Sequence, residues 1–470
     1  MSRFRPSRGM GSNMRTDRAQ MEVPEYPDIA VPARDPGHVT CEIVRSENEF
    51  ASLFQSWERL TTLSKARIYQ TFDWQWTWWS HFGSGLGLHI IVLRHNGEII
   101  GLAPFCVETD SVWGLPYRRR LKMVGCDVRI KEPSGITITY DISDYLDIII
   151  HPGHTGPAVE SIAQYLRDHV SEYDAIELTN VPDGSLIMKS LVPRLREGGF
   201  RILASRADVC PRLKVPSSME AYLQSLGNNV RRRLLQAKAA ANGGGLFTIE
   251  CAEGPADWPG SVRELAALHQ QRWNRIGYPG LFFEGRFGRF IHDVVGRMQE
   301  RGRVWLKIAT SGGKTVAVRL GFCFNDAFYD YLSGFDDQSA AAKRRPGIAL
   351  LLSMIEDARA LNAETVDFLR GEEAYKFEMS SGAADNWRVT ALSPSPAHAS
   401  WLRAILSFVD GGIRWWWKER LLMRVQSQQH RFPSSAINYL RFRAASAARK
   451  IKRAGGRGSG YQSEKLNVHA

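Results

Sequence analysis

The sequence predicts an α/β (α+β) protein made of two mixed-sheet lobes and a basic tail. Its 470 residues are 44% hydrophobic, and at about 150 residues per domain they make two or three units. Residues 303–309 and 315–324 alternate apolar and polar side chains around the turn Ser311-Gly312-Gly313-Lys314, which indicates a β-hairpin. A helical apolar pattern begins at Pro346, so both element types occur within one lobe.

The remaining elements of the second half follow from local patterns. Residues 327–333 predict a third strand that ends before Gly334. Pro346 fits the first position of a helix, where its missing amide hydrogen costs nothing, and Ile348, Leu351 and Ile355 recur at helical spacing. Residues 364–369 predict a short buried strand and residues 387–392 a final strand. The expected order is three antiparallel strands, a helix, a strand, a polar cluster and a last strand.

The loop before the predicted helix suits an anion. Arg344 and Arg345 precede it, and Gly347 allows a ligand to approach the backbone closely. Unpaired N–H groups and the positive end of the helix then favour a pyrophosphate. An ordinary basic helix entry explains the same residues, so the loop alone leaves both interpretations open.

The polar cluster after residues 364–369 consists of Glu372, Glu373, Tyr375 and Lys376. Ionisable side chains gathered directly after a buried strand suit a functional site. The alternatives are a solvated loop for the glutamates, core packing for the tyrosine and a surface position for the lysine.

These segments resemble the GNAT acyltransferase superfamily, in particular its CelD-like branch associated with bacterial exopolysaccharide and cellulose loci. The resemblance rests on Tyr331-Leu332-Ser333-Gly334-Phe335-Asp336, on Arg345-Pro346-Gly347, and on Val366-Asp367-Phe368-Leu369-Arg370-Gly371 followed by Tyr375-Lys376. Residues 212–238 and 265–277 are similar to the entry strand and helices of that fold. The first half repeats the theme more faintly in Thr71-Phe72-Asp73-Trp74, at the turn Asn96-Gly97 and in residues 143–147. We therefore expect two tandem GNAT-like lobes, as in the Fem-type aminoacyltransferases.

The resemblance implies an acyltransferase that uses acyl-CoA, first of all acetyl-CoA, or an acyl carrier protein, and no metal. The acceptor would be an amino or hydroxyl group of an envelope or exopolysaccharide precursor: a sugar, a lipid or an amine. Catalysis would fall to four residues: Glu372 or Glu373 as the general base, Tyr375 as the proton donor, and Lys376, which would bind a phosphate or an acceptor carboxylate. Donor binding would fall to Arg344, Arg345, Gly347, Ile348 and Ala349. The alternatives are Fem-type aminoacyl transfer and a catalytically silent scaffold of a polysaccharide-synthesis complex at the inner membrane.

Charge and composition indicate a leader at 1–35 and a tail at 399–470, and the resemblance implies lobes at 36–205 and 206–398. Residues 401–470 hold 14 lysines and arginines against three acids, so the tail carries nearly all of the net charge of +12. With a near-neutral body, no nucleic-acid partner is expected. Trp415-Trp416-Trp417 between Arg414 and Lys418 suits an anionic membrane surface, although a helix packed on the body explains the tryptophans equally well.

No signal peptide is recognisable near the start, and no run reaches the roughly 18 apolar residues of a membrane span. The six scattered cysteines predict neither a zinc site nor disulfides, so a cytoplasmic location is expected, with peripheral attachment at the inner membrane through the tail.

Three further polar groups are weaker candidates. His269, Arg272 and Trp273 lie within one helical turn and form a possible substrate-facing patch, although a structural role is favoured for the histidine. Asp144, Tyr145 and Asp147 line an inter-lobe cleft or hold turns, and Asp336 is expected to cap a turn.

Overall fold

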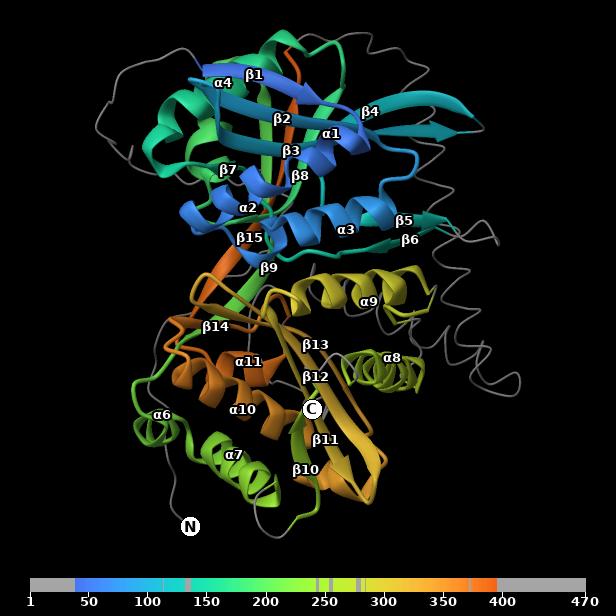
Figure 1. Cartoon of the computed structure of the whole chain (residues 1–470), viewed down its shortest axis with the longest axis vertical. Coiled ribbons are helices and arrows are strands. Elements are labelled where there is room, and N and C mark those ends of the chain that lie inside the picture. Colours follow the sequence, from blue (N-terminus) through green and yellow to red (C-terminus); the bar gives the residue numbers. More distant parts are fainter. Residues whose placement is uncertain are drawn as a thin grey trace, which may run out of the picture.

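The computed structural model describes residues 39–112, 114–131, 137–241, 245–252, 257–275, 280–283, 285–371 and 373–394. Within these residues 13 strands form one mixed sheet, in the order β1-β2-β3-β4-β8-β15-β9-β14-β13-β12-β11-β10, with β7 beside β3. The first lobe lies above the second in Figure 1, and helices from both lobes pack on the sheet. The predicted α/β class is confirmed.

The first lobe contains the elements up to α5. They are β1 (Val39–Val44), α1 (Glu47–Ser52), α2 (Phe54–Leu63), α3 (Phe72–Phe82), β2 (Gly87–His95), β3 (Glu98–Val112), β4 (Leu115–Met123), β5 (Val128–Lys131), β6 (Thr137–Tyr140), β7 (Ile149–Ile150), α4 (Thr155–Asp168), β8 (Ala175–Pro182) and α5 (Val192–Glu197). The predicted hairpin at Asn96-Gly97 is confirmed, because both residues have the positive φ, 50° and 83°, that a tight hairpin turn requires.

The second lobe contains the elements from β9 onwards. They are β9 (Arg201–Lys214), α6 (Met219–Ser225), α7 (Asn228–Ala241), β10 (Thr248–Cys251), α8 (Trp258–Arg275), α9 (Arg286–Gln299), β11 (Val304–Ser311), β12 (Lys314–Phe324), β13 (Ala327–Phe335), α10 (Pro346–Ala360), β14 (Thr365–Asp367), α11 (Ala374–Met379) and β15 (Gly382–Leu392). The predicted order is confirmed, including the start of α10 at Pro346.

Two predicted boundaries were wrong. The strand expected at 364–369 ends at Asp367, because Leu369 adopts a left-handed conformation (φ 57°) and its N–H donates to Asp367 Oδ1 at 2.9 Å. The final strand begins five residues earlier than expected, at Gly382, because β9 offers a continuous partner from Arg212 to Arg201.

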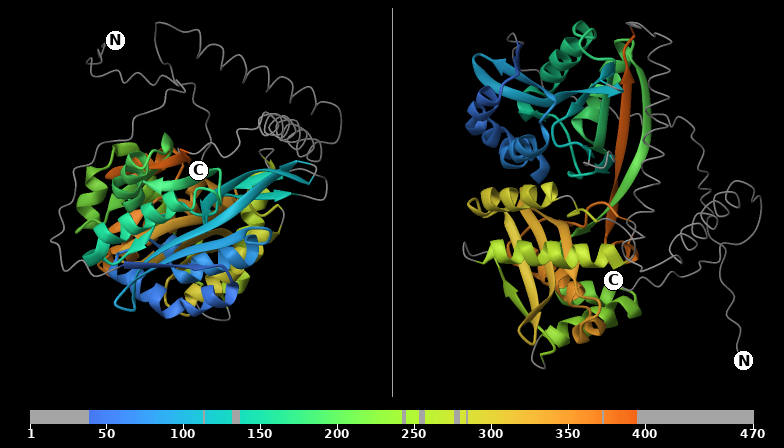
Figure 2. Two further views of the ribbon diagram at one scale, coloured as in Figure 1. Left: turned by 90° about the horizontal axis from the view of Figure 1, so that it is seen from above. Right: turned by 90° about the vertical axis from the view of Figure 1, so that its right-hand side faces the viewer.

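Strands β9 and β15 join the two lobes. β15 pairs with β8 of the first lobe on one side and with β9 on the other, while the far edge of β9 pairs with β14 at Asp367↔Arg212. Figure 2 shows these two long strands running side by side from one lobe to the other. The predicted division at residues 205 and 206 falls within β9.

The hydrophobic core also continues across the lobes. Trp74 of α3 is fully buried, and its ring makes edge contacts with Phe290 of α9 and Phe322 of β12. Helices α3 and α9 face each other there (Figure 1). Within the second lobe, a separate cluster of buried hydrophobic side chains packs α10 against the sheet. The first lobe therefore supports the second by direct packing.

All six cysteines are free thiols. No helix in the described part of the chain has the length and apolarity needed to cross a bilayer. The leader and the tail from residue 395 onwards lie outside the described residues.

Candidate active site

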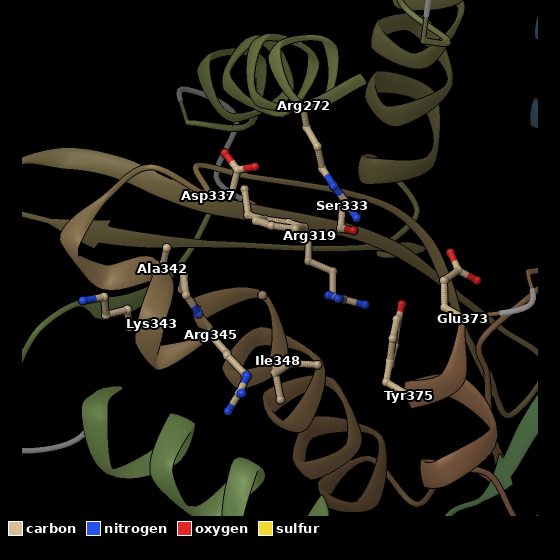
Figure 3. Close-up of a pocket in the computed structure, with 13 residues that line it drawn as sticks. Arg272, Arg319, Ser333, Asp337, Ala342, Lys343, Arg345, Ile348, Glu373 and Tyr375 are labelled. Atoms are coloured by element: carbon tan, nitrogen blue, oxygen red, sulfur yellow. The ribbon is translucent and has the colours of Figure 1, made fainter. Parts of the chain in front are cut away.

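A cavity of about 400 Å³ opens in the second lobe (Figure 3). Its walls come from α8, β12, β13, the loop before α10, the first turn of α10 and the start of α11. The lining residues are Arg272, Arg319, Ser333, Phe335, Asp337, Ala342, Lys343, Arg345, Pro346, Gly347, Ile348, Glu373 and Tyr375.

The cavity exists because two neighbouring strands separate. β13 and β14 run parallel and pair only where residues 327–329 lie beside residues 365–367. β14 then ends, whereas β13 continues to Phe335, so Ser333 and Phe335 lie beside open space instead of a paired strand. A ligand can therefore reach the centre of the sheet.

One end of the cavity is basic and lies at the start of α10. Arg345 is the N-cap in a left-handed conformation (φ 54°, ψ 62°), and no side chain caps the helix. Burial and the nearby Arg233 lower the pKa of Arg345, which reflects the concentration of positive charge at this end. Lys343, Arg345 and the positive helix end therefore suit a phosphate.

Not every predicted donor-binding residue reaches this end. Gly347 and Ile348 line the cavity together with Arg345. Arg344 is exposed outside the lining, and Ala349 is buried in the helix, where its N–H donates to the Arg345 carbonyl at 3.2 Å. An added Cβ at Gly347 would meet only Phe335 Cδ1, at 3.9 Å, so a side chain fits there sterically.

Tyr375 stands at the other end, on the first turn of α11, and its hydroxyl points toward Arg319 (Figure 3). Arg319 is buried and pairs with Asp330, with Nη1 2.5 Å from Oδ2. Burial raises the pKa of Tyr375, while the Arg319 cation acts in the opposite direction. The phenol therefore stays protonated at neutral pH, and the cation stabilises the phenolate formed when the proton leaves.

Glu373 lines the same end, and more than half of its side chain is exposed. Lys376 is different: it is buried outside the lining, its Nζ donates to the Arg370 carbonyl at 2.6 Å, and it pairs with Glu373 at 3.3 Å. Burial lowers the pKa of Lys376, but Tyr375 and Glu373 raise it, and the net shift is upward. Lys376 thus fastens the turn that carries Glu373. Glu372 lies outside the described residues.

The weaker candidates mostly have structural contacts. His269 is buried, and its Nε2 accepts from Trp273 Nε1 at 2.9 Å, while burial lowers its pKa to about 4. Asp336 Oδ1 accepts from the Gln338 N–H at 2.9 Å, which confirms the predicted turn cap. Arg272 does reach the cavity.

The first-lobe residues brace the turn between β14 and α11. The Tyr145 hydroxyl donates to Asp367 at 2.8 Å, and Arg212 Nε donates to the same carboxylate at 2.7 Å. Asp144 pairs with Arg370 Nε at 2.7 Å. Asp147 instead accepts three backbone N–H groups within its own lobe, and burial raises its pKa to about 6.

Sequence reasoning missed Arg319, Ser333, Asp337, Ala342 and Lys343 as cavity residues. A charged residue in the middle of the apolar strand residues 316–322 was a signal for Arg319, since a buried cation needs a partner. Lys343 extends the basic run of Arg344 and Arg345, whereas Ser333, Asp337 and Ala342 carry no local signal.

Comparison with known proteins agrees with this geometry. Residues 228–377, which span α7 to α11, match the model of the acetyltransferase (GNAT) domain family. Among solved structures, FemX aligns at a TM-score of 0.50 and 12% identity, over 73% of this chain and 96% of FemX. A conserved protein of unknown function from Bacteroides thetaiotaomicron VPI-5482 aligns at a TM-score of 0.44 and 10% identity, over 75% of this chain and 100% of that one.

A tandem GNAT protein from the clavulanic acid biosynthesis pathway aligns at a TM-score of 0.40 and 12% identity, over 77% of this chain and 100% of that one. The comparison with curated proteins gives no match. FemX shares the fold, while the CelD-like branch finds no support among these matches. The chain therefore carries an acyltransferase domain of the acetyltransferase (GNAT) type over residues 228–377, within a fold similar to that of FemX.

Proposed function

We propose that the protein transfers an acyl group from acyl-CoA, first of all acetyl-CoA, to an amino or hydroxyl group. One observation carries this proposal: a single cavity joins the basic start of α10 to Tyr375 and Glu373 where β13 and β14 separate. The matched GNAT domain supports the reaction class and a CoA donor.

Each end of the cavity has a distinct task in this reaction. Lys343, Arg345 and the N-terminus of α10 hold the donor pyrophosphate. Glu373 takes the proton of the acceptor, directly or through a water molecule, as the acceptor attacks the thioester carbonyl. A new C–N or C–O bond forms, the C–S bond breaks, and the leaving thiolate takes its proton from the Tyr375 hydroxyl.

The acceptor is proposed from the resemblance to the CelD-like branch. It is an envelope or exopolysaccharide precursor with a sugar, lipid or amine nucleophile, and the donor is acyl-CoA or an acyl carrier protein. We further propose that the protein acts in the cytoplasm and attaches peripherally to the inner membrane through residues 399–470.

Aminoacyl transfer is the second candidate. The two-lobed fold that the chain shares with FemX supports it, together with the resemblance to Fem-type enzymes. Against it stands the near-neutral body, because a charged tRNA would favour a basic surface. A catalytically silent scaffold would retain the cavity without turnover.

Calorimetric titration of acetyl-CoA into the full-length protein, combined with an assay of free thiol release, separates these functions. The proposal predicts stoichiometric binding and thiol release that depends on an added amine or hydroxyl acceptor. Binding without release for every acceptor and acyl-CoA tried would favour the scaffold. Binding of aminoacyl-tRNA but of no acyl-CoA would favour aminoacyl transfer.

A further inference from the structure

Arg272 is a positively charged residue of the cavity lining to which the proposed reaction assigns no role. It projects from α8 into the cavity, opposite the wall formed by α10 (Figure 3). Its guanidinium Cζ lies 4.4 Å from the centroid of the Phe335 ring, which is a cation–π contact. Within the described part of the chain Arg272 has no carboxylate partner.

The packing of α8 on β13 fixes this position. At Gly334, an added Cβ would lie 2.8 Å from the Leu265 carbonyl oxygen and 2.9 Å from the His269 amide nitrogen. Only glycine permits this approach of the helix backbone to the strand. Arg272 follows one helical turn after His269 and is therefore held over Phe335, the residue after Gly334.

The charges around the cavity leave Arg272 uncompensated. Arg319 is neutralised by Asp330, and Asp337 pairs with Arg275 of the same helix as Arg272. A donor pyrophosphate at the start of α10 would satisfy Lys343 and Arg345. Burial lowers the pKa of Arg272, whereas Tyr375 and Glu373 raise it, so Arg272 lies within electrostatic reach of the catalytic end. A ligand anion at that end would therefore pair with Arg272.

We propose that Arg272 binds a carboxylate beside the thioester, carried either by the acyl group of the donor or by the acceptor. A guanidinium above an aromatic ring still has N–H groups to offer a ligand, and a planar carboxylate can accept two parallel hydrogen bonds from them. The inference rests on the proposed acyl transfer and deepens it by naming the substrate class. Arg272 would thus be a specificity-determining residue.

The test compares the full-length wild type with Arg272→Gln, which keeps an amide donor but removes the charge. Arg263→Gln is the matched control, because Arg263 is an exposed arginine of the same helix and lies outside the lining. Calorimetric titration with succinyl-CoA and with acetyl-CoA tests whether the acyl group of the donor carries the carboxylate. Thiol release from acetyl-CoA with glycine or glycinamide as the acceptor tests whether the acceptor carries the carboxylate.

The inference predicts a preference of about 10-fold to 100-fold for the carboxylate-bearing partner of one pair, expressed in Kd or KM. Arg272→Gln should abolish that preference, Arg272→Lys should retain part of it, and Arg263→Gln should leave it unchanged. A preference for succinyl-CoA assigns the carboxylate to the acyl group, and a preference for glycine assigns it to the acceptor.

Binding and use of acetyl-CoA with no preference in either pair, or with a preference that survives in Arg272→Gln, would overturn this inference alone. A wild-type protein that binds none of the acyl-CoA probes would contradict both the inference and the proposed function.

Discussion

Tyr375 gains its proposed role from two neighbours. Its hydroxyl lies at the cavity end nearest Arg319, whose charge Asp330 balances on the buried side. Removing the hydroxyl in Tyr375→Phe should lower turnover by roughly 100-fold to 10,000-fold with unchanged donor affinity, because proton donation to the thiolate is lost while the pyrophosphate site is intact. Steady-state thiol release and calorimetry measure the two quantities.

Tyr222→Phe is the matched control for this substitution. The Tyr222 hydroxyl donates to the Met379 carbonyl at 2.9 Å, at the far end of α11. That variant should lose about 1 kcal/mol of unfolding free energy and keep its turnover. Wild-type turnover in Tyr375→Phe would assign the tyrosine to packing.

We expect buried His269 to make the unfolding free energy depend on pH. Burial lowers its pKa from 6.5 to about 4 in the folded state, so below pH 6.5 the unfolded chain binds more protons than the folded one. The unfolding free energy therefore falls as the pH drops from 6.5 to 4, and by pH 5 this residue has removed about 2 kcal/mol. Urea denaturation at pH 7 and pH 5 measures the loss.

His269→Gln should show a smaller decrease between these two pH values, because the titrating group is gone. His89, whose pKa burial also lowers to about 4, acts in the same direction in both proteins and cancels in the comparison. An equal decrease in the wild type and the variant would show that His269 does not carry this effect.

At the level of elements, the turn between β14 and α11 determines where the catalytic end lies. Leu369 is left-handed, and Gly371 has φ 140° with the Glu373 carboxylate packed against it. Lys376 ties this turn to the Arg370 carbonyl. The left-handed conformation of Leu369 is stabilised by the Asp367 carboxylate, which accepts a hydrogen bond from the Leu369 N–H.

Lys376→Met tests whether this lysine supports the turn or binds a ligand. We expect the unfolding free energy to fall by about 1.5–3 kcal/mol, because a charge-assisted hydrogen bond is lost, while the Kd for acetyl-CoA stays unchanged. Lys238→Met, which removes the exposed pair with Glu356, should cost about 1 kcal/mol or less. Weaker donor binding without loss of stability would instead assign Lys376 to the ligand.

The sequence predicted those elements that carry local signals. The turn around Gly312-Gly313, the Asn96-Gly97 turn and the start of α10 at Pro346 were predictable because each depends on residues within a few positions. The end of β14 was not predictable in this way, because it depends on the hydrogen bond between Asp367 and the left-handed Leu369.

Most of the cavity also depends on contacts that no local pattern encodes. Arg319 pairs with a residue on the next strand, and Arg272 reaches Phe335 only because Gly334 admits α8. The pairing of β15 with β9 joins residues that are 170 to 191 positions apart in the sequence. The sequence therefore predicted which loops line the cavity better than it predicted the residues that surround them.

At the scale of the whole molecule, the first lobe supports the cavity of the second. It shares the sheet through β8 and β15, and it supplies Tyr145 and Asp144 to Asp367 and Arg370. The first lobe thus holds the β14–α11 turn, which forms one end of the cavity in the second lobe.

Residues 399–470 remain predicted to bind anionic membranes. Full-length protein should float with anionic vesicles, and added salt should release it, because exposed charges are screened over about 8 Å at physiological ionic strength. Replacing Trp415, Trp416 and Trp417 with alanine should abolish flotation. Flotation of this variant at the wild-type level, or flotation insensitive to salt, would contradict the prediction.

The most direct test of the account is the affinity for acetyl-CoA when the start of α10 is blocked. Gly347 is the second residue of α10, and a valine there fits against Phe335 but occupies the part of the cavity next to the start of the helix. Gly156, the second residue of α4 in the first lobe, has no atom near its added Cβ and provides the matched control.

Calorimetric titration should therefore give a Kd for acetyl-CoA at least about 10-fold weaker in Gly347→Val, a difference of about 1.4 kcal/mol, with Gly156→Val equal to the wild type. Equal affinity in all three folded proteins would place the donor elsewhere and contradict the assignment of this cavity.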